Sequence, residues 1–163
     1  MDFYVKKDIR KCVRLCTVFF FTGFLLFFIA QSGLLGFVWA FQIAGVSTLT
    51  AGIYLTVRYI LTDYAVSVCD RTEYDLDLVV SEIRNKRKIV VCRISAAGIY
   101  EVRKVDRGEK KEKNALKNSF DYRNEFLPDR YIDILAEESG EKIRLKLPYS
   151  EDLYGFLIKI GEK

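Results

Sequence analysis

The stretch LCTVFFFTGFLLFFIAQSGLLGFVWAFQIAGVSTLTAGIYLTV, residues 15–57, decides the architecture of this chain. It holds 43 consecutive residues without an Asp, Glu, Lys or Arg, in a protein of 163 residues of which 29% are charged. A helix needs about 20 apolar residues to cross the hydrocarbon core of a bilayer. The stretch is too long for one crossing, and its length predicts two transmembrane helices.

A polar break divides the stretch into two segments. The first, about residues 15–30, is rich in Phe, and the second covers about residues 35–60, with Gln-Ser-Gly at 31–33 between them. Residues of this kind favour a turn, and so short a connection requires antiparallel neighbours. We expect a two-helix transmembrane hairpin over residues 15–61.

The second segment carries small residues at four-residue spacing. Ala40, Ala44, Thr48 and Gly52 fall on one helical face, and small residues there allow another helix to approach closely. We expect the first helix to pack on this face, because a tethered neighbour costs less entropy than a second molecule. A homodimer through the same face is the alternative.

Basic residues flank the hairpin and are absent from its turn. Residues 1–14, expected to be a basic cytoplasmic segment, contain five basic and two acidic residues, and Arg58 follows the second helix. The positive-inside rule therefore predicts that both termini are cytoplasmic and that the protein is integral to the cytoplasmic membrane. The long apolar run also differs from a cleavable signal peptide, whose apolar core has about 7–15 residues.

From residue 62 onward the hydrophobic period changes to two, which predicts β-strands. Seven segments are predicted as strands, most by alternation and 88–94 by its β-branched residues: residues 62–69, 74–80, 88–94, 99–105, 120–126, 131–136 and 142–147. A charged loop, residues 106–118, separates the fourth segment from the fifth. An amphipathic helix with Ser150 as its N-cap follows the last strand.

The order of four strands, a long loop, three strands and a C-terminal helix resembles the pleckstrin-homology-like (PH-like) fold over residues 62–163. That resemblance implies seven antiparallel strands in two sheets, four-stranded and three-stranded, closed by the helix. With the preceding hairpin and the sequence Tyr-Ile-Leu-Thr-Asp-Tyr at 59–64, the chain resembles small bacterial membrane proteins of the YcxB-like type. An OB-like barrel is the alternative fold, although its usual five strands fit less well.

Few residues point to catalysis. The chain has no histidine, which excludes His-dependent triads and most catalytic zinc sites. Cys69 and Cys92 fall in predicted strands, and we interpret them as reduced thiols of the core. Asp75 and Asp77 share a strand face and could bind a metal, but they alternate with apolar residues, which favours a solvated face. We therefore expect no enzymatic activity, metal or cofactor.

One basic cluster stands out in the soluble region. Arg84, Lys86, Arg87 and Lys88 occupy a predicted hairpin turn, where they could contact anionic lipid or a partner, and a solvated turn is the simpler interpretation. The region from 58 to 163 has 21 basic and 20 acidic residues, and this near neutrality argues against nucleic acid as a partner.

These patterns predict an integral membrane protein that presents a non-enzymatic interaction or scaffold domain at the cytoplasmic face. Its expected partners are the lipid bilayer and a protein that the sequence does not identify. Two alternatives remain: a subunit of a small oligomeric channel or pore, and a sensor of anionic lipid that acts through residues 84–88.

Overall fold

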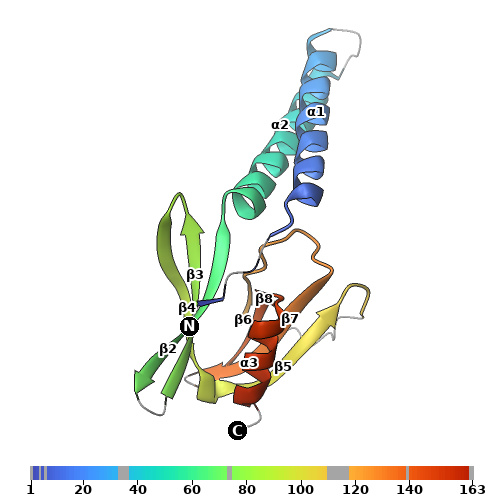
Figure 1. The fold of residues 1–163 in the computed structure, drawn as a ribbon. Coiled ribbons are helices and arrows are strands. Elements are labelled where there is room, and N and C mark those ends of the chain that lie inside the picture. The colour runs from blue at the N-terminus through green and yellow to red at the C-terminus, as the bar shows by residue number, and fades with distance from the viewer. Residues whose placement is uncertain are drawn as a thin grey trace. The chain divides into compact units, whose positions relative to one another are not determined.

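A computed structural model of the chain describes residues 2, 3, 5, 7–32, 37–72, 75–109, 118–138 and 140–161. The chain forms two compact units (Figure 1). The helical unit is Asp8–Thr62, and the β-unit combines Met1–Lys7 with Asp63–Lys163. The β-unit is therefore assembled from sequence on both sides of the helical unit.

The helical unit is an antiparallel pair of helices. Helix α1 spans Arg10–Gln31, helix α2 spans Val38–Leu55, and the π-helical turn η1 continues over Thr56–Ile60. The two expected helices are present, and the first begins earlier than its uncharged run. Gly33 of the predicted turn and residues 34–36 lie outside the described residues. At 1.5 Å per residue, the 22 residues of α1 measure about 33 Å, enough to cross a bilayer core of about 30 Å.

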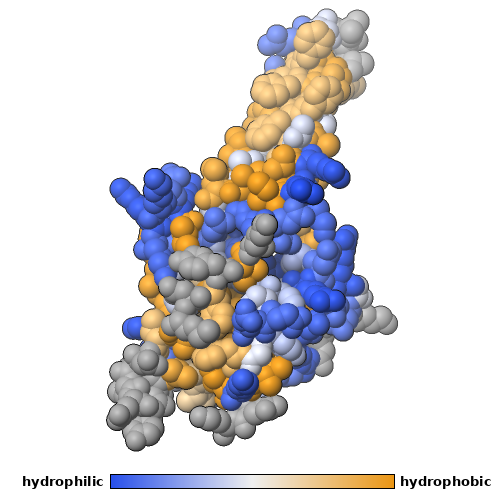
Figure 2. Space-filling model, viewed as in Figure 1, coloured by the Kyte–Doolittle hydropathy of each residue, from blue (hydrophilic) through white to orange (hydrophobic). Residues whose placement is uncertain are grey.

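Most of the apolar surface of these helices is unburied. Only 17% of the apolar window of each helix is buried. Side chains of α1 and α2 that are between 64% and 74% exposed include Phe21, Phe24, Phe28, Trp39 and Tyr54. Hydrophobic side chains cover the visible face of the pair (Figure 2). A soluble protein rarely leaves so much contiguous apolar surface uncovered, whereas helices of this length and composition are suited to crossing a membrane.

The two helices meet along a seam of alternating three- and four-residue spacing. The buried and half-buried positions that follow this spacing are 12, 16, 19, 23, 26 and 30 in α1, and 41, 45, 48, 52 and 55 in α2. Such a repeat keeps one face of each helix turned to its partner. Two glycines permit the close approach: a Cβ on Gly23 would lie 2.7 Å from Leu49, and one on Gly45 would lie 3.0 Å from Phe27.

Only part of the α2 face that was expected to pack against α1 lies in the seam. Gly52 is buried in the seam, Ala40 and Thr48 are half-buried, and Ala44 is exposed. Gly45, its neighbour, is buried instead. The reason is the helical period, because a strict four-residue spacing drifts around a helix of 3.6 residues per turn, whereas alternating steps of three and four stay on one face.

Replacing Gly45 by Leu is expected to destabilise the helix pair by about 1–3 kcal/mol, because the new side chain would collide with Phe27. Ala44→Leu is the matched control, since Ala44 is exposed in α2, and it is expected to leave stability almost unchanged. Thermal unfolding of the full chain in detergent, followed by circular dichroism, compares the two variants. An equal loss of stability in the two variants would contradict the assignment of Gly45, and not Ala44, to the helix seam.

The β-unit contains two sheets and one helix, α3 (Figure 1). The first sheet has the order β1-β2-β3-β4, formed by Asp2–Phe3, Asp63–Thr72, Asp75–Arg84 and Arg87–Ser95. The second has the order β5-β7-β8-β6, formed by β5 Ile99–Asp106, β6 Asn118–Asp121, β7 Arg130–Glu138 and β8 Glu141–Pro148. A 3-10 turn, Ala96–Gly98, carries the chain from one sheet to the other.

The seven strands expected after the hairpin are present, but their arrangement differs from the expected one. Strand β5, expected in the first sheet, pairs with β7 in the second. The fourth strand of the first sheet is instead β1, from the N-terminus. Strand β6 pairs parallel to β8, so the second sheet is mixed rather than antiparallel. Alternation shows which residues form strands and which face they bury, but it carries no information on which strands pair.

One core lies between the sheets and α3, which spans Glu151–Gly161. Side chains with no exposed surface include Ile132, Leu145, Leu147, Leu153 and Leu157. The expected N-cap is confirmed, because the Leu153 backbone N–H donates to Ser150 Oγ at 3.1 Å. The helix thus covers the apolar faces that the two sheets share.

The N-terminal segment, expected to be a separate basic region, contributes strand β1. Asp2 and Phe3 pair antiparallel with Ser67 and Val66 of β2. The Phe3 side chain is 6% exposed and belongs to the core, with its ring centroid 5.7 Å from that of Phe156. The sequence pattern does not reveal so short a strand, because two residues are too few to show alternation.

The chain leaves and re-enters the β-unit at neighbouring points. Lys7 is the last residue before the helical unit and Asp63 is the first after it. The Lys7 Nζ donates to Asp63 Oδ1 at 2.5 Å. Both ends of the helical hairpin are therefore held together by the β-unit itself.

Phe3→Ala is expected to lower the free energy of unfolding of the β-unit by about 3 kcal/mol, because a buried aromatic side chain is lost from the core. Tyr100→Ala removes an aromatic side chain that is 49% exposed and is expected to cost far less. Denaturant titration of the full chain in detergent measures both. A Phe3→Ala variant as stable as the unaltered chain would show that β1 is dispensable.

Candidate functional site

The acidic residues considered as metal ligands do not form a metal site among the described residues. Within them there is no cluster of three His, Cys, Asp or Glu residues suited to a metal ion. Asp77, considered with Asp75 for a metal, is 2% exposed, and its Oδ2 lies 3.2 Å from Arg93 Nε. The side chain of Asp75 lies outside the described residues. Asp77 thus has a structural partner in Arg93.

The basic cluster forms the tip of the hairpin between β3 and β4. Arg84 pairs directly across from Arg87. Asn85 and Lys86 make the turn between them, with φ of 48° and 68°. A two-residue turn with positive φ at both positions is a type I′ turn, which matches the twist of a hairpin. All residues from 84 to 88 are exposed.

Like charges oppose each other at this tip. Cross-strand neighbours of the same sign destabilise a hairpin unless another charge compensates them. Arg84, Lys86 and Arg87 form no ion pair with a carboxylate of any described residue. The three side chains therefore present an uncompensated positive charge to solvent.

Aliphatic side chains follow the basic tip along β4. Ile89, Val90 and Val91 are 59%, 58% and 38% exposed. Successive strand residues point to opposite faces, so both faces of this part of β4 are uncovered. The register shifts by one residue here, with Val80 opposite Cys92 and the next residue of β3 opposite Val90. Figure 2 shows hydrophilic side chains at the hairpin tip with hydrophobic ones next to them.

The register of the first sheet places this hairpin tip at the end where β2 begins. Asp63, the first residue of β2, pairs with Ile83, and Arg84 follows directly. Only Leu61 and Thr62 separate β2 from η1. The basic tip therefore lies beside the point at which the chain enters the β-unit.

A loop, residues 122–129, is held at the same end of the β-unit. Tyr64 N–H donates to Asn124 Oδ1 at 2.6 Å, and Asn124 Nδ2 donates to the Tyr64 carbonyl at 2.9 Å. Part of this loop was expected to continue a strand over 120–126, but the strand ends at Asp121. The side chain of Leu127 is 57% exposed, and its φ of 56° lies in the left-handed region that bulky residues rarely adopt.

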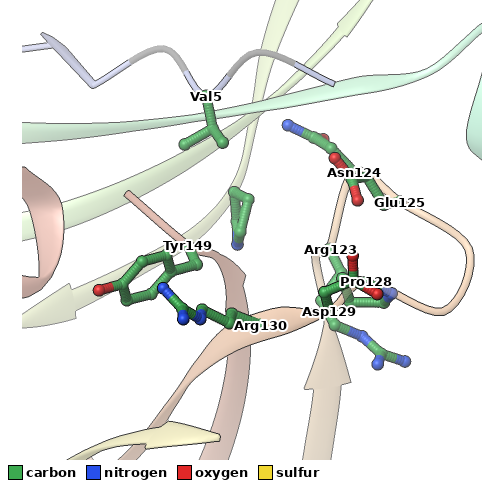
Figure 3. A pocket seen from close by; sticks show the side chains of 9 residues that line it. Val5, Arg123, Asn124, Glu125, Pro128, Asp129, Arg130 and Tyr149 are labelled. Atoms are coloured by element: carbon green, nitrogen blue, oxygen red, sulfur yellow. The ribbon is translucent and has the colours of Figure 1, made fainter. Parts of the chain in front are cut away.

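A pocket of about 190 Å³ opens beside this loop (Figure 3). Its charged side chains are largely neutralised. Arg123 pairs with Asp121 at 2.5 Å, and Arg130 pairs with Asp106 at 2.9 Å. Glu125 and Asp129 of the lining add two negative charges to the two positive ones. Ligand pockets usually measure about 300–1,000 Å³, so this one is too small and too evenly charged to indicate a ligand.

The side chains of Tyr122 and Cys92 are hydrogen-bonded to each other, and both pack against the core. Burial, reinforced by Cys92, raises the pKa of Tyr122 to about 12. Burial also raises the pKa of the Cys92 thiol. Cys69, expected in the core with Cys92, is exposed, whereas Cys92 is half-buried. Cys69 belongs to the opposite face of β2 from Val68, and it is Val68 that enters the core.

Iodoacetamide is expected to alkylate Cys69 at least about tenfold faster than Cys92 at pH 8, because the thiolate is the reactive form and burial keeps Cys92 protonated. Raising the pH is expected to narrow the difference, since more of Cys92 then ionises. Mass spectrometry of the alkylated full chain in detergent reports both sites, and Cys69→Ser identifies the fast one. Equal rates at pH 8 would contradict the assignment of Cys69 to the outer face.

Comparison of the chain with protein-family models, with curated proteins and with solved structures finds no match.

Proposed function

We propose that this chain is an integral membrane protein whose two helices anchor a non-enzymatic interaction domain at the cytoplasmic face of the membrane. The pairing of β1 with β2 carries the proposal. One strand precedes the helical unit and the other follows it, and both belong to one sheet. Two crossings return a chain to the side from which it started, so this pairing suits a hairpin with both ends on one side.

The distribution of basic residues supports a cytoplasmic domain. Arg10, Lys11 and Arg14 lie in the first turns of α1 and Arg58 lies in η1, and the antiparallel pairing of the helices brings them to the same end. Residues 15–57, which include the turn of the hairpin, contain no charged residue. Basic residues favour the cytoplasmic side of a membrane.

The architecture of the β-unit supports a PH-like domain of the YcxB-like type. Two packed sheets and a C-terminal helix agree with that fold. The contribution of β1 and the parallel pairing of β6 with β8 are departures from it. A PH-like domain fixed beside a membrane is well placed to bind a lipid surface or a protein partner.

A binding role is favoured over catalysis by the character of the exposed residues. The end of the β-unit where β2 begins carries exposed aliphatic side chains and cations that pair with no carboxylate of the described residues. Contact surfaces have this composition, whereas a catalytic site needs a nucleophile, acid or base held in a defined geometry. A small oligomeric pore is the alternative, because exposed Ala44 could admit a helix of a second copy.

Thiol accessibility tests the anchoring and the orientation. In intact bacterial cells, a membrane-impermeant maleimide is expected to leave Cys69 unlabelled until the membrane is permeabilised, because the β-unit faces the cytoplasm. In a Cys69→Ser background, Ser32→Cys at the end of α1 is expected to be labelled from outside, since residue 32 borders the turn and is exposed. Cys69→Ser alone measures the background from the other thiols. Labelling of both sites from the same side, or release of the protein by alkaline carbonate, would refute the proposal.

A further inference from the structure

We infer that the β3–β4 hairpin and the Leu127 loop form a docking end that binds an anionic lipid surface. We define the docking end as residues 84–90 together with Leu127. The inference rests on the proposed function, because it requires the β-unit to be held beside a bilayer. It deepens that function by naming the partner, the head groups of anionic phospholipids, and the residues that contact it.

Arg84 and Arg87 differ from the other arginines of the β-unit whose side chains are described. Six arginines of the unit each pair with a carboxylate, namely Arg93, Arg103, Arg107, Arg123, Arg130 and Arg144. Arg84 and Arg87, which face each other across the tip, have no such partner among the described residues. An anionic surface would supply the missing countercharge and relieve the repulsion between them.

The apolar residues of the docking end suit insertion between head groups. Ile89 and Val90 are 59% and 58% exposed. Leu127 is 57% exposed at a φ of 56°. A left-handed backbone costs free energy for a bulky residue and usually marks a functional constraint. Exposed aliphatic side chains next to cations are the combination by which peripheral surfaces bind the membrane interface.

Two sets of contacts hold the docking end at the start of β2. The hairpin is tied there by the pairing of Ile83 with Asp63. The loop is tied there by the two hydrogen bonds between Asn124 and the Tyr64 backbone. Only Leu61 and Thr62 separate the start of β2 from η1, so the docking end adjoins the short segment that joins the β-unit to the helices in sequence.

A lipid surface fits this end better than an extended peptide that adds a strand to β4. Strand β4 is the edge of the first sheet, but Lys88 and the register shift opposite Val80 interrupt it. Edge lysines and bulges are the features by which sheets avoid pairing with another strand. A lipid surface needs no continuous row of backbone partners and tolerates both features.

Hydrogen exchange of the full chain in nanodiscs tests the inference. Backbone amides of residues 86–91 and 126–127 are expected to exchange more slowly in discs containing about one-third phosphatidylserine than in pure phosphatidylcholine, and high salt is expected to remove the difference. Lys86→Gln with Arg87→Gln is expected to weaken docking roughly 30-fold, since each charge contributes about fivefold. Lys142→Gln with Lys159→Gln removes two exposed charges elsewhere and is expected to leave the protection intact.

A second pair of variants tests the apolar contribution. Ile89→Ser with Leu127→Ser is expected to reduce the protection while leaving its salt dependence, because the cations remain. Tyr100→Ser, at a site 49% exposed, is the control. Wild-type chain that enters the discs but exchanges identically in both lipids would overturn the inference and leave the proposed function standing. Failure to enter discs would overturn both. Protection produced by added polyglutamate, and not by phosphatidylserine, would replace the lipid by an acidic peptide partner.

Discussion

The pairing of β1 with β2 is the constraint on which the rest of this structure depends. It joins Phe3 to Val66, which precede and follow the helical unit in the sequence. The ion pair between Lys7 and Asp63 joins the two ends of the segment between them. Closing a long loop costs conformational entropy. The antiparallel packing of α1 on α2 at Gly23 and Gly45 offsets part of this cost, because it brings the two ends of the helical unit close together. The sheet and the helix pair thus stabilise each other through the chain.

The start of β2 explains why the basic hairpin tip and the 122–129 loop lie at the same end of the β-unit. Strand β2 starts where the chain returns from the helices, and its first residues hold both the hairpin through Ile83 and the loop through Asn124. Six other arginines of the unit pair with a carboxylate, as in the bidentate pair of Arg144 with Asp133. Among the arginines whose side chains are described, Arg84 and Arg87 differ from these six in having no carboxylate partner within the described residues.

Local patterns predict the elements of this chain well and their partners poorly. The uncharged run identifies both helices, alternation identifies the strands from β2 onward, and Ser150 marks the start of α3. The assignment of β5 to the first sheet is wrong, as is the core position of Cys69. Each error concerns which face or which strand a residue meets, and alternation alone leaves both choices open.

The sequence by itself determines that two long apolar helices precede a mostly-β region with a basic hairpin turn at residues 84–88, because hydropathy and period are local properties. Only the tertiary structure decides that the N-terminus supplies β1, that Gly45 and not Ala44 enters the helix seam, and that Leu127 lies at the same end as the basic turn. These facts depend on contacts between residues far apart in the chain. Such contacts depend on which strands and helices pair and on side-chain hydrogen bonds between distant residues, which no short stretch of sequence determines.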